Sequence, residues 1–250
     1  MCYRPLHMKF QQIMLNVIKF LVLTLCWGFT QTSSCHLAGN IGLLREDSLQ
    51  QSLEKFQKRS STVKTLITVN SDGAPFMGSK ESRVTLVEFS DYQCFFCRRH
   101  DRQVAPKIIK EYVETGKVKY VFRDFPLDSH PRASLAAVAA HCAGDQNHYW
   151  KMNDLLFRYQ KALSHNALIK FAKSLGLNNA TFQKCVESGK YAKKVLNSRN
   201  DGDKAGVDST PYFFLGLTNR KNSEIIVKII LKGAQPYWVF QNAIESLLID

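Results

Sequence analysis

Acidic residues are absent from the first 34 positions of this 250-residue sequence, and the apolar run there is short. Positive charge comes from one arginine and two lysines, ten mostly apolar residues cover 20–29, and small polar residues follow at 30–34. A transmembrane helix needs about 20 apolar residues. The order of basic, apolar and small polar segments therefore predicts a secretory signal peptide at 1–34. An uncleaved amino-terminal anchor is the alternative.

The sequence also lacks repeats, low-complexity tracts and any motif for binding nucleic acid. Hydrophobic residues make up 45% and charged residues 22% of the chain, which is typical of a globular protein and excludes a disordered or fibrous one. Lys and Arg number 34 against 21 Asp and Glu, and basic residues cluster at 98–110 and 190–199. We expect these clusters to be a solvated surface, with attraction to anionic lipid or wall polymer as the alternative.

An odd number of cysteines needs an explanation in an exported protein. Cys2 and Cys26 leave with the predicted signal peptide. Cys35 follows two serines, where a bacterial lipoprotein carries its acylated cysteine, although Thr32 replaces the usual leucine. Lipidation of Cys35, cleavage beyond it and a retained free thiol are the three alternatives. Export predicts an oxidising compartment, in which paired cysteines persist. The seven cysteines are Cys2, Cys26, Cys35, Cys94, Cys97, Cys142 and Cys185.

Strand and helix patterns predict an α/β domain. Residues 84–89 form a short β-branched, apolar run that suits a buried strand. A helix follows from Cys94 towards Gly116, with Pro106 expected to kink it, and residues 118–122 alternate like a second strand. A strand, a helix and a strand over this length indicate a βαβ unit with parallel strands.

The domain is expected to be interrupted by a helical insertion. Helical patterns fill the stretch after residue 130, and strand character returns in two runs that predict a hairpin, followed by a final helix. An amphipathic helix at 41–66 is expected to dock on the domain, with homodimer formation as the alternative. The expected boundaries are 1–34 for the signal peptide, 35–66 for an amino-terminal helical extension, 67–130 for the first part of the α/β domain, 131–206 for the insertion and 207–250 for the second part.

Cys94-Phe-Phe-Cys97 follows a predicted strand and opens a predicted helix. The unpaired N–H groups and dipole of a helix amino terminus stabilise a thiolate at the first cysteine, and the second cysteine can close a disulfide with it. A zinc site needs four ligands, and only His100 and His141 are loose candidates, so we expect no metal. Haem attachment needs His where Arg98 stands. A purely structural disulfide remains the alternative to a redox pair that needs no cofactor.

Glu88 and the Thr210-Pro211 dipeptide are further candidate site residues. Glu88 lies in the first strand, on the same face as Leu86, so we expect it to be buried and to exchange protons with Cys97; a solvent-facing Glu88 is the alternative. Pro211 begins a strand, where proline is allowed. A cis bond there would place the Thr210 main chain against a substrate, whereas an ordinary trans proline would have no such role.

These motifs resemble the DsbA-like thiol–disulfide oxidoreductases of the thioredoxin superfamily, over roughly residues 67–249. The resemblance rests on the segments 84–100, 120–126, 133–143, 149–150, 154–157, 209–216 and 233–236. It implies a thioredoxin fold with an inserted α-helical domain, Cys94 as nucleophile, Cys97 as resolving cysteine, Glu88 as buried acid, and Thr210 before a cis-Pro211. Family members often have Pro and then His or Tyr between the cysteines, where this chain has Phe95 and Phe96. We therefore assign no strongly oxidising potential, and expect the two rings to contact unfolded substrates.

Cys142 and Cys185 each lie on the apolar face of a predicted helix in the insertion. A disulfide between them is expected from the export prediction and from family members with such a bond; two buried free thiols are the alternative.

The sequence predicts an exported oxidoreductase of the periplasm or cell envelope, lipid-anchored if Cys35 is acylated. It would introduce disulfides into unfolded or partly folded thiol-containing proteins and be reoxidised by a membrane redox partner. The alternatives are a dimeric isomerase or reductase, and a non-enzymatic envelope lipoprotein that uses the fold for binding.

Overall fold

Six strands form one mixed β-sheet in the part of the chain that the structure, a computed structural model, describes: residues 67–71, 73–219 and 222–249. The predicted signal peptide, the 35–66 extension and Cys35 lie outside these residues. The strand order is β1-β6-β5-β3-β4-β2. Strands β3 and β4 are parallel, and the other neighbouring strands are antiparallel. The strands are β1 (Thr68–Asn70), β2 (Phe76–Met77), β3 (Val84–Ser90), β4 (Val118–Asp124), β5 (Tyr212–Thr218) and β6 (Glu224–Lys232).

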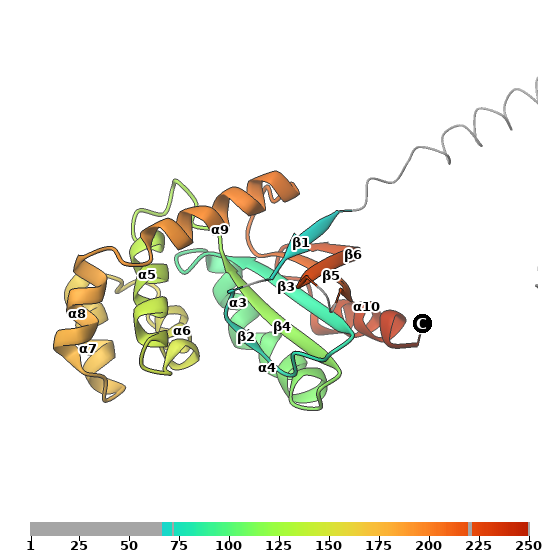
Figure 1. Cartoon of the computed structure of the whole chain (residues 1–250), viewed down its shortest axis with the longest axis horizontal. Coiled ribbons are helices and arrows are strands. Elements are labelled where there is room, and N and C mark those ends of the chain that lie inside the picture. Colours follow the sequence, from blue (N-terminus) through green and yellow to red (C-terminus); the bar gives the residue numbers. More distant parts are fainter. Residues whose placement is uncertain (1–66, 72, 220–221, 250) are drawn as a thin grey trace, which may run out of the picture. The chain divides into compact units, whose positions relative to one another are not determined.

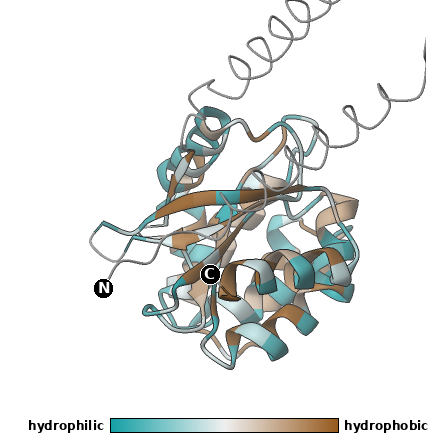
Figure 2. Cartoon of the chain, turned by 90° about the vertical axis from the view of Figure 1, so that its right-hand side faces the viewer, coloured by the Kyte–Doolittle hydropathy of each residue, from teal (hydrophilic) through white to brown (hydrophobic). Residues whose placement is uncertain are grey.

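The central strands are the predicted apolar runs. Every residue of β3 and β4 is buried, and Figure 2 shows apolar residues concentrated along the strands. The predicted βαβ unit and the β5–β6 hairpin are both confirmed. The register of β5 against β6 shifts at Gly216, where a Cβ atom would lie 2.2 Å from the carbonyl oxygen of Ile226. Only glycine allows this close approach of two backbones.

The predicted kinked helix after Cys94 is in fact broken. Helix α3 (Phe95–Gln103) ends before Val104, and α4 (Ala105–Ile108) begins immediately afterwards with Pro106 in its first turn. Proline lacks an N–H donor, so it fits the first turn of a new helix better than the interior of an old one. A π-helical turn, Ile109–Val113, completes the segment. The segment predicted as one helix with a kink at Pro106 is therefore two helices that meet at Val104.

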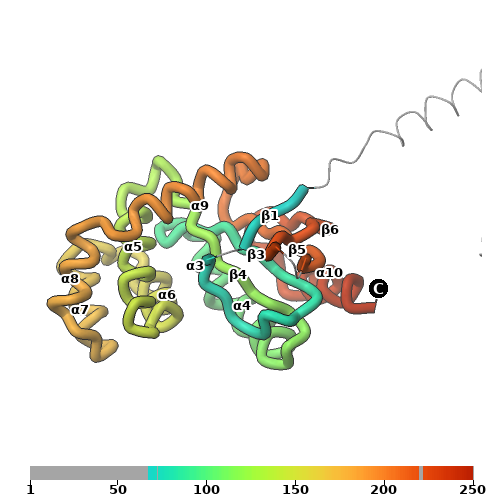
Figure 3. Tube along the Cα trace, in the orientation of Figure 1, coloured from blue at the N-terminus to red at the C-terminus, as the bar shows by residue number. Residues whose placement is uncertain are grey.

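Two helical layers cover the sheet. Helices α4 and α10 (Tyr237–Ile249) share one apolar cluster with β3, β4 and β5, and α3 meets the same face through the ring of His100. Helix α9 (Ala192–Ala205) packs against β4 and β1. The chain leaves the sheet after β4 and returns in β5, with five helices between them (Figures 1 and 3). The other four helices are α5 (Ala133–Gly144), α6 (Tyr149–Arg158), α7 (His165–Ser174) and α8 (Asn179–Glu187).

The inserted helices have an apolar cluster that reaches the sheet. Besides alanines and leucines of α5 to α8, this cluster contains Tyr92, Cys94, Cys97 and Phe122. The fold is thus a thioredoxin-like sheet with a helical insertion, and the CxxC pair lies in the cluster that joins the two. Within the described residues, no helix is both long enough and apolar enough to span a membrane.

Candidate active site

The two cysteines of the CxxC motif lie where β3 ends and α3 begins. Cys94 is the N-cap residue of α3, and its Sγ accepts a hydrogen bond from the backbone N–H of Cys97 at 3.4 Å. The Cys94 thiol donates to the carbonyl oxygen of Thr210 at 3.3 Å, and the Thr210–Pro211 bond is cis. Both cysteines are buried free thiols. The structure therefore describes the reduced pair, with the predicted Thr210 against it.

The environment separates the proton affinities of the two thiols. A hydrogen bond from the Cys97 side chain lowers the pKa of Cys94 to about 6, with further hydrogen bonds from the backbone of the first helical turn; burial opposes them. Burial raises the pKa of Cys97 well above its ordinary value, and the Cys94 thiol adds to the increase. A deprotonated Cys94 and a protonated Cys97 at neutral pH are what a nucleophile and a buried leaving thiol require.

Asp91 holds the loop that leads into α3. Its Oδ1 accepts hydrogen bonds from the backbone N–H groups of Gln93 and Cys94, at 2.6 and 3.1 Å. Its Oδ2 accepts from the N–H of Leu127 at 2.8 Å and lies 2.9 Å from Nδ1 of His130. The aspartate thereby fixes the chain direction at which Cys94 enters the helix. The sequence analysis missed it, although an aspartate three residues before a helix N-cap is a recognisable turn signal.

Glu88 is buried, as predicted from the alternation in its strand. Burial raises its pKa to about 7, and a hydrogen bond from the Tyr120 hydroxyl to Oε2 limits the increase. Nε2 of His100 lies 3.2 Å from the same hydroxyl. Burial lowers the pKa of His100 to about 3, and its ring packs between Phe213 and Phe240. Because the Tyr120 hydroxyl donates to Glu88, the neutral imidazole must donate its Nε2–H to Tyr120.

Tyr120 could have been found in the sequence, since β3 and β4 are parallel and Tyr120 shares the Glu88 face of the sheet. His100 entered the sequence analysis only as a loose zinc ligand. It bonds instead to Tyr120, and His141 pairs with Asp124 at 2.8 Å. Among the described residues, no group of three or more His, Cys, Asp or Glu side chains is placed to hold a metal ion.

Gln160 ties the insertion to the active-site loop. Its side-chain amide donates to the carbonyl oxygens of Tyr92 and Cys94, each at 2.8 Å. The residue follows α6, far along the chain from the CxxC motif. No local signal in the sequence points to this contact.

Phe95 and Phe96 lie on the surface beside Cys94, with 63% and 50% of their areas exposed. Their rings meet edge to face at 5.5 Å, and the Arg99 guanidinium lies 4.9 Å from the Phe96 ring. Arg99 also donates to the carbonyl of Ala234 at 2.9 Å, which holds it in place over the ring. The two phenylalanines form an exposed apolar surface next to the reactive sulfur.

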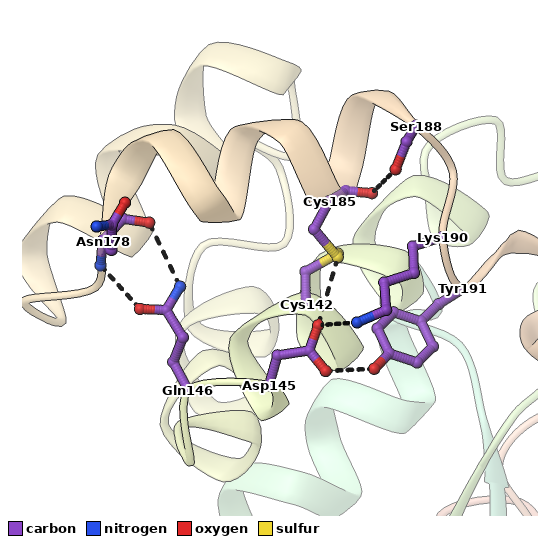
Figure 4. The surroundings of a disulfide bond; sticks show 8 residues. All are labelled: Cys142, Asp145, Gln146, Asn178, Cys185, Ser188, Lys190 and Tyr191. Carbon is purple, nitrogen blue, oxygen red and sulfur yellow. Dashed lines mark hydrogen bonds and ion pairs between the residues drawn. A yellow bond between two sulfur atoms is a disulfide. The ribbon is translucent and has the colours of Figure 1, made fainter.

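The second cysteine pair forms a disulfide between α5 and α8 (Figure 4). Cys142 and Cys185 have a Cα–Cα distance of 5.8 Å, within the ordinary range for a disulfide. Beside this bond, the Asp145 carboxylate accepts hydrogen bonds from Lys190, at 2.7 Å, and from Tyr191. The bond closes the helical insertion on itself and involves neither cysteine of the CxxC motif.

Residues 70–230 match the sequence profile of a family described as thioredoxin, which is more than half of the chain. The chain belongs to the thioredoxin family. Its fold is DsbA-like: α-DsbA1 of Wolbachia pipientis is 28% identical and superposes with a TM-score of 0.62, covering 71% of this chain and 92% of that one.

Two curated relatives extend the comparison. A Rickettsia typhi protein, RT0103, is named as a candidate protein-disulfide oxidoreductase; it is 25% identical over 186 residues, which are 72% of this chain and 68% of that protein. The Na(+)/H(+) antiporter NhaA 3 of Salinispora tropica is 32% identical over 151 residues, 60% of this chain. The match spans only 22% of the antiporter's length. The chain is therefore similar to a part of that larger protein.

Proposed function

We propose that this chain is an exported thiol–disulfide oxidoreductase that introduces disulfides into thiol-containing proteins, with Cys94 as nucleophile and Cys97 as resolving cysteine. The observation that carries the proposal is the position of Cys94 at the N-cap of α3, with donors around its sulfur. In the oxidised enzyme, a substrate thiolate attacks the sulfur of Cys94 and forms a mixed disulfide. Cys97 leaves as a thiolate and takes a proton, and a second substrate thiol then displaces Cys94.

The other site residues have roles in the same reaction. Glu88 supplies the proton to Cys97, Thr210 and cis-Pro211 present a backbone edge to the substrate beside Cys94, and the exposed rings of Phe95 and Phe96 receive apolar side chains of unfolded chains. In this proposal the thioredoxin domain has two parts, 67–130 and 207–250, and the helical insertion between them is 131–206.

The pKa of Cys94 sets a limit on the oxidising strength. A thiol with a pKa of about 6 favours the reduced form at pH 7 by about 1.4 kcal/mol over an ordinary thiol, or about 30 mV. About 150 mV separates thioredoxin from the most oxidising family members. We therefore propose a disulfide donor of moderate strength, in keeping with the absence of a polar residue between the cysteines.

Export to a periplasm or cell envelope is part of the proposal. The Cys142–Cys185 disulfide supports it, because disulfides persist in oxidising compartments and are rare in the cytosol. Reoxidation of Cys94 and Cys97 then falls to a membrane redox partner. Lipidation of Cys35 would anchor the domain at the membrane surface.

The test is the equilibrium potential of the Cys94–Cys97 pair against glutathione, together with oxidative refolding of a reduced substrate protein. We expect a potential more oxidising than the value of about −270 mV for thioredoxin, refolding that Cys94→Ala abolishes, and a mixed disulfide that accumulates in Cys97→Ala. The Cys142→Ala, Cys185→Ala pair is the matched control and should retain the potential. A value near −270 mV would contradict the oxidase direction, and unchanged substrate binding without any redox activity would favour the binding protein.

A further inference from the structure

The basic residues at 98–110 have no part in the proposed reaction, and two of them contact other helices. Arg102 pairs with Asp154 of α6 at 2.8 Å, and the ammonium of Lys107 lies 5.6 Å from the centre of a tyrosine ring in α10. In the part of the chain that the structure describes, no carboxylate lies within ion-pair distance of Arg99. This cation therefore lacks an acidic partner there, on the helix that begins at the reactive cysteine.

Two contacts hold the Arg99 guanidinium beside the CxxC motif. Its Nη2–H donates to the carbonyl oxygen of Ala234 at 2.9 Å, and its central carbon lies 4.9 Å from the centre of the Phe96 ring. A guanidinium has five N–H donors in a rigid plane, so the bond to Ala234 leaves others available. Because the side chain is already ordered, a bound carboxylate would cost little of the conformational entropy that weakens most exposed ion pairs.

The loop after β6 joins Arg99 to the backbone beside the reactive sulfur. The carbonyl oxygen of Pro211 accepts a hydrogen bond from the N–H of Gly233 at 2.8 Å, and the carbonyl oxygen of Thr210 accepts from the Cys94 thiol at 3.3 Å. Hydrogen bonds therefore run from Cys94 through the cis-proline segment and the loop at 233–234 to the arginine. A substrate whose sulfur reacts at Cys94 meets the same rim.

The spacing along α3 sets how far the arginine lies from the substrate cysteine. Arg99 follows Cys94 by five positions, which is about 7.5 Å along a helix axis. An extended chain advances about 3.3 to 3.6 Å per residue. A side chain about two residues from the substrate cysteine can therefore reach the guanidinium.

Two acidic residues in the neighbouring loops are already occupied. Asp208, just before the Thr210–Pro211 bond, pairs with Lys232 at 2.6 Å. Both carboxylate oxygens of Asp91 accept hydrogen bonds from backbone N–H groups. Neither acid neutralises Arg99, so the rim presents a positive charge to a substrate.

We propose that Arg99 selects substrates with an Asp or Glu about two residues from the reacting cysteine, an inference that rests on the proposed function. The substrate carboxylate accepts N–H groups of the guanidinium. The substrate thiolate then bonds to the sulfur of Cys94, the Cys94–Cys97 bond breaks, and the second substrate thiol displaces Cys94. The substrate loses two electrons and two protons, and the cysteine pair gains them. Arg99 takes no part in these transfers and determines only specificity.

The test is the rate at which two matched peptides reduce the oxidised full chain at neutral pH. Each peptide has two cysteines, with a single Glu or Gln midway between them, two residues from each. Acid quenching and alkylation of free thiols give the rate constants, and the preference is the ratio of the Glu to the Gln rate constant. The effect of Glu on the acidity of the peptide's own thiols is the same for every variant and cancels from the comparison.

We expect Arg99→Gln to lower this preference about fivefold at an ionic strength of about 0.01 M, the upper end of the range for exposed ion pairs. At about 1 M the wild-type preference should fall towards that of the variant, because salt screens the pair. Arg99→Lys keeps the charge but loses the planar fork, so it should retain part of the preference. Arg99→Glu should reverse it.

Lys110→Gln is the matched control, because it removes an exposed positive charge from the same segment, and it should keep the wild-type preference. A preference that Arg99→Gln leaves unchanged, or that Lys110→Gln lowers as much, would overturn the assignment to Arg99. So would a wild-type preference that does not decline with salt, which needs no substitution. If the oxidised wild type reacts with neither peptide, the proposed function fails and the inference with it.

Discussion

Glu88→Gln should change the pH dependence of stability, because the glutamate is the one titrating group that it removes. Below pH 4.5, its ordinary pKa, Glu88 is protonated in both the folded and the unfolded chain. Between pH 4.5 and about 7 the unfolded chain loses this proton and the folded chain keeps it, so stability falls as the pH rises. Above the folded pKa of about 7, both are ionised and the loss is complete.

The interval from 4.5 to about 7, at about 1.4 kcal/mol per pH unit, gives a loss of about 3 kcal/mol. The Gln variant does not titrate there, so its stability relative to the parent should rise by about 3 kcal/mol between pH 4.5 and 7.5. An effect of the new amide on Tyr120 that is the same at every pH cancels, because the test uses only how the difference in unfolding free energy changes with pH.

Urea unfolding at half-unit pH steps measures the difference. Both proteins should carry Cys94→Ala, which prevents an active-site disulfide while the Cys142–Cys185 bond stays intact without added reductant. A difference that stays constant within about 1 kcal/mol across this pH range would refute the reasoning, and Glu88 would then have an ordinary pKa in the folded protein.

Three further predictions concern other parts of the molecule. Replacing Cys142 and Cys185 together by Ala should cost about 4 kcal/mol in urea unfolding, from the chain entropy of a loop with a separation of 43 residues; less than about 1 kcal/mol would contradict that origin. Thiolate absorbance of reduced Cys97→Ser, whose hydroxyl keeps a donor beside Cys94, should show Cys94 ionising below its ordinary pKa; a midpoint near 9 would refute the influence of these hydrogen bonds. Gly216→Ala should lower the thermal midpoint by several degrees or more, since its Cβ would meet a backbone carbonyl; an unchanged midpoint would show that the β-bulge relaxes freely.

The features that could be predicted from the sequence are those that short-range patterns decide. The β-branched run at 84–89 and the alternation at 118–122 gave the parallel β3–β4 pair, and Glu88 followed from its place in the first run. The helix start at Cys94 followed from the CxxC motif after a strand. These predictions needed no knowledge of distant residues, because a continuous apolar run is by itself typical of a strand that is buried on both faces.

The missed features depend on residues far apart in the chain. Strands β1 and β2 have three and two residues, too few to show a period. The burial of His100 is decided by Phe213 and Phe240, more than a hundred residues later. Gln160 reaches the active-site loop only because α6 packs beside α3. No window of local sequence contains such contacts.

The two hydrogen bonds of Gln160 make the helical insertion a support of the active site. The amide occupies carbonyl oxygens that lie at the very entrance of α3, so the helical insertion completes the scaffold of the redox centre. A shortened chain from which 131–206 had been deleted would expose these carbonyls, together with the apolar wall around Cys97. Transplanting the CxxC segment of this protein into a plain thioredoxin sheet would thus carry over its sulfurs but leave behind part of what holds them in position.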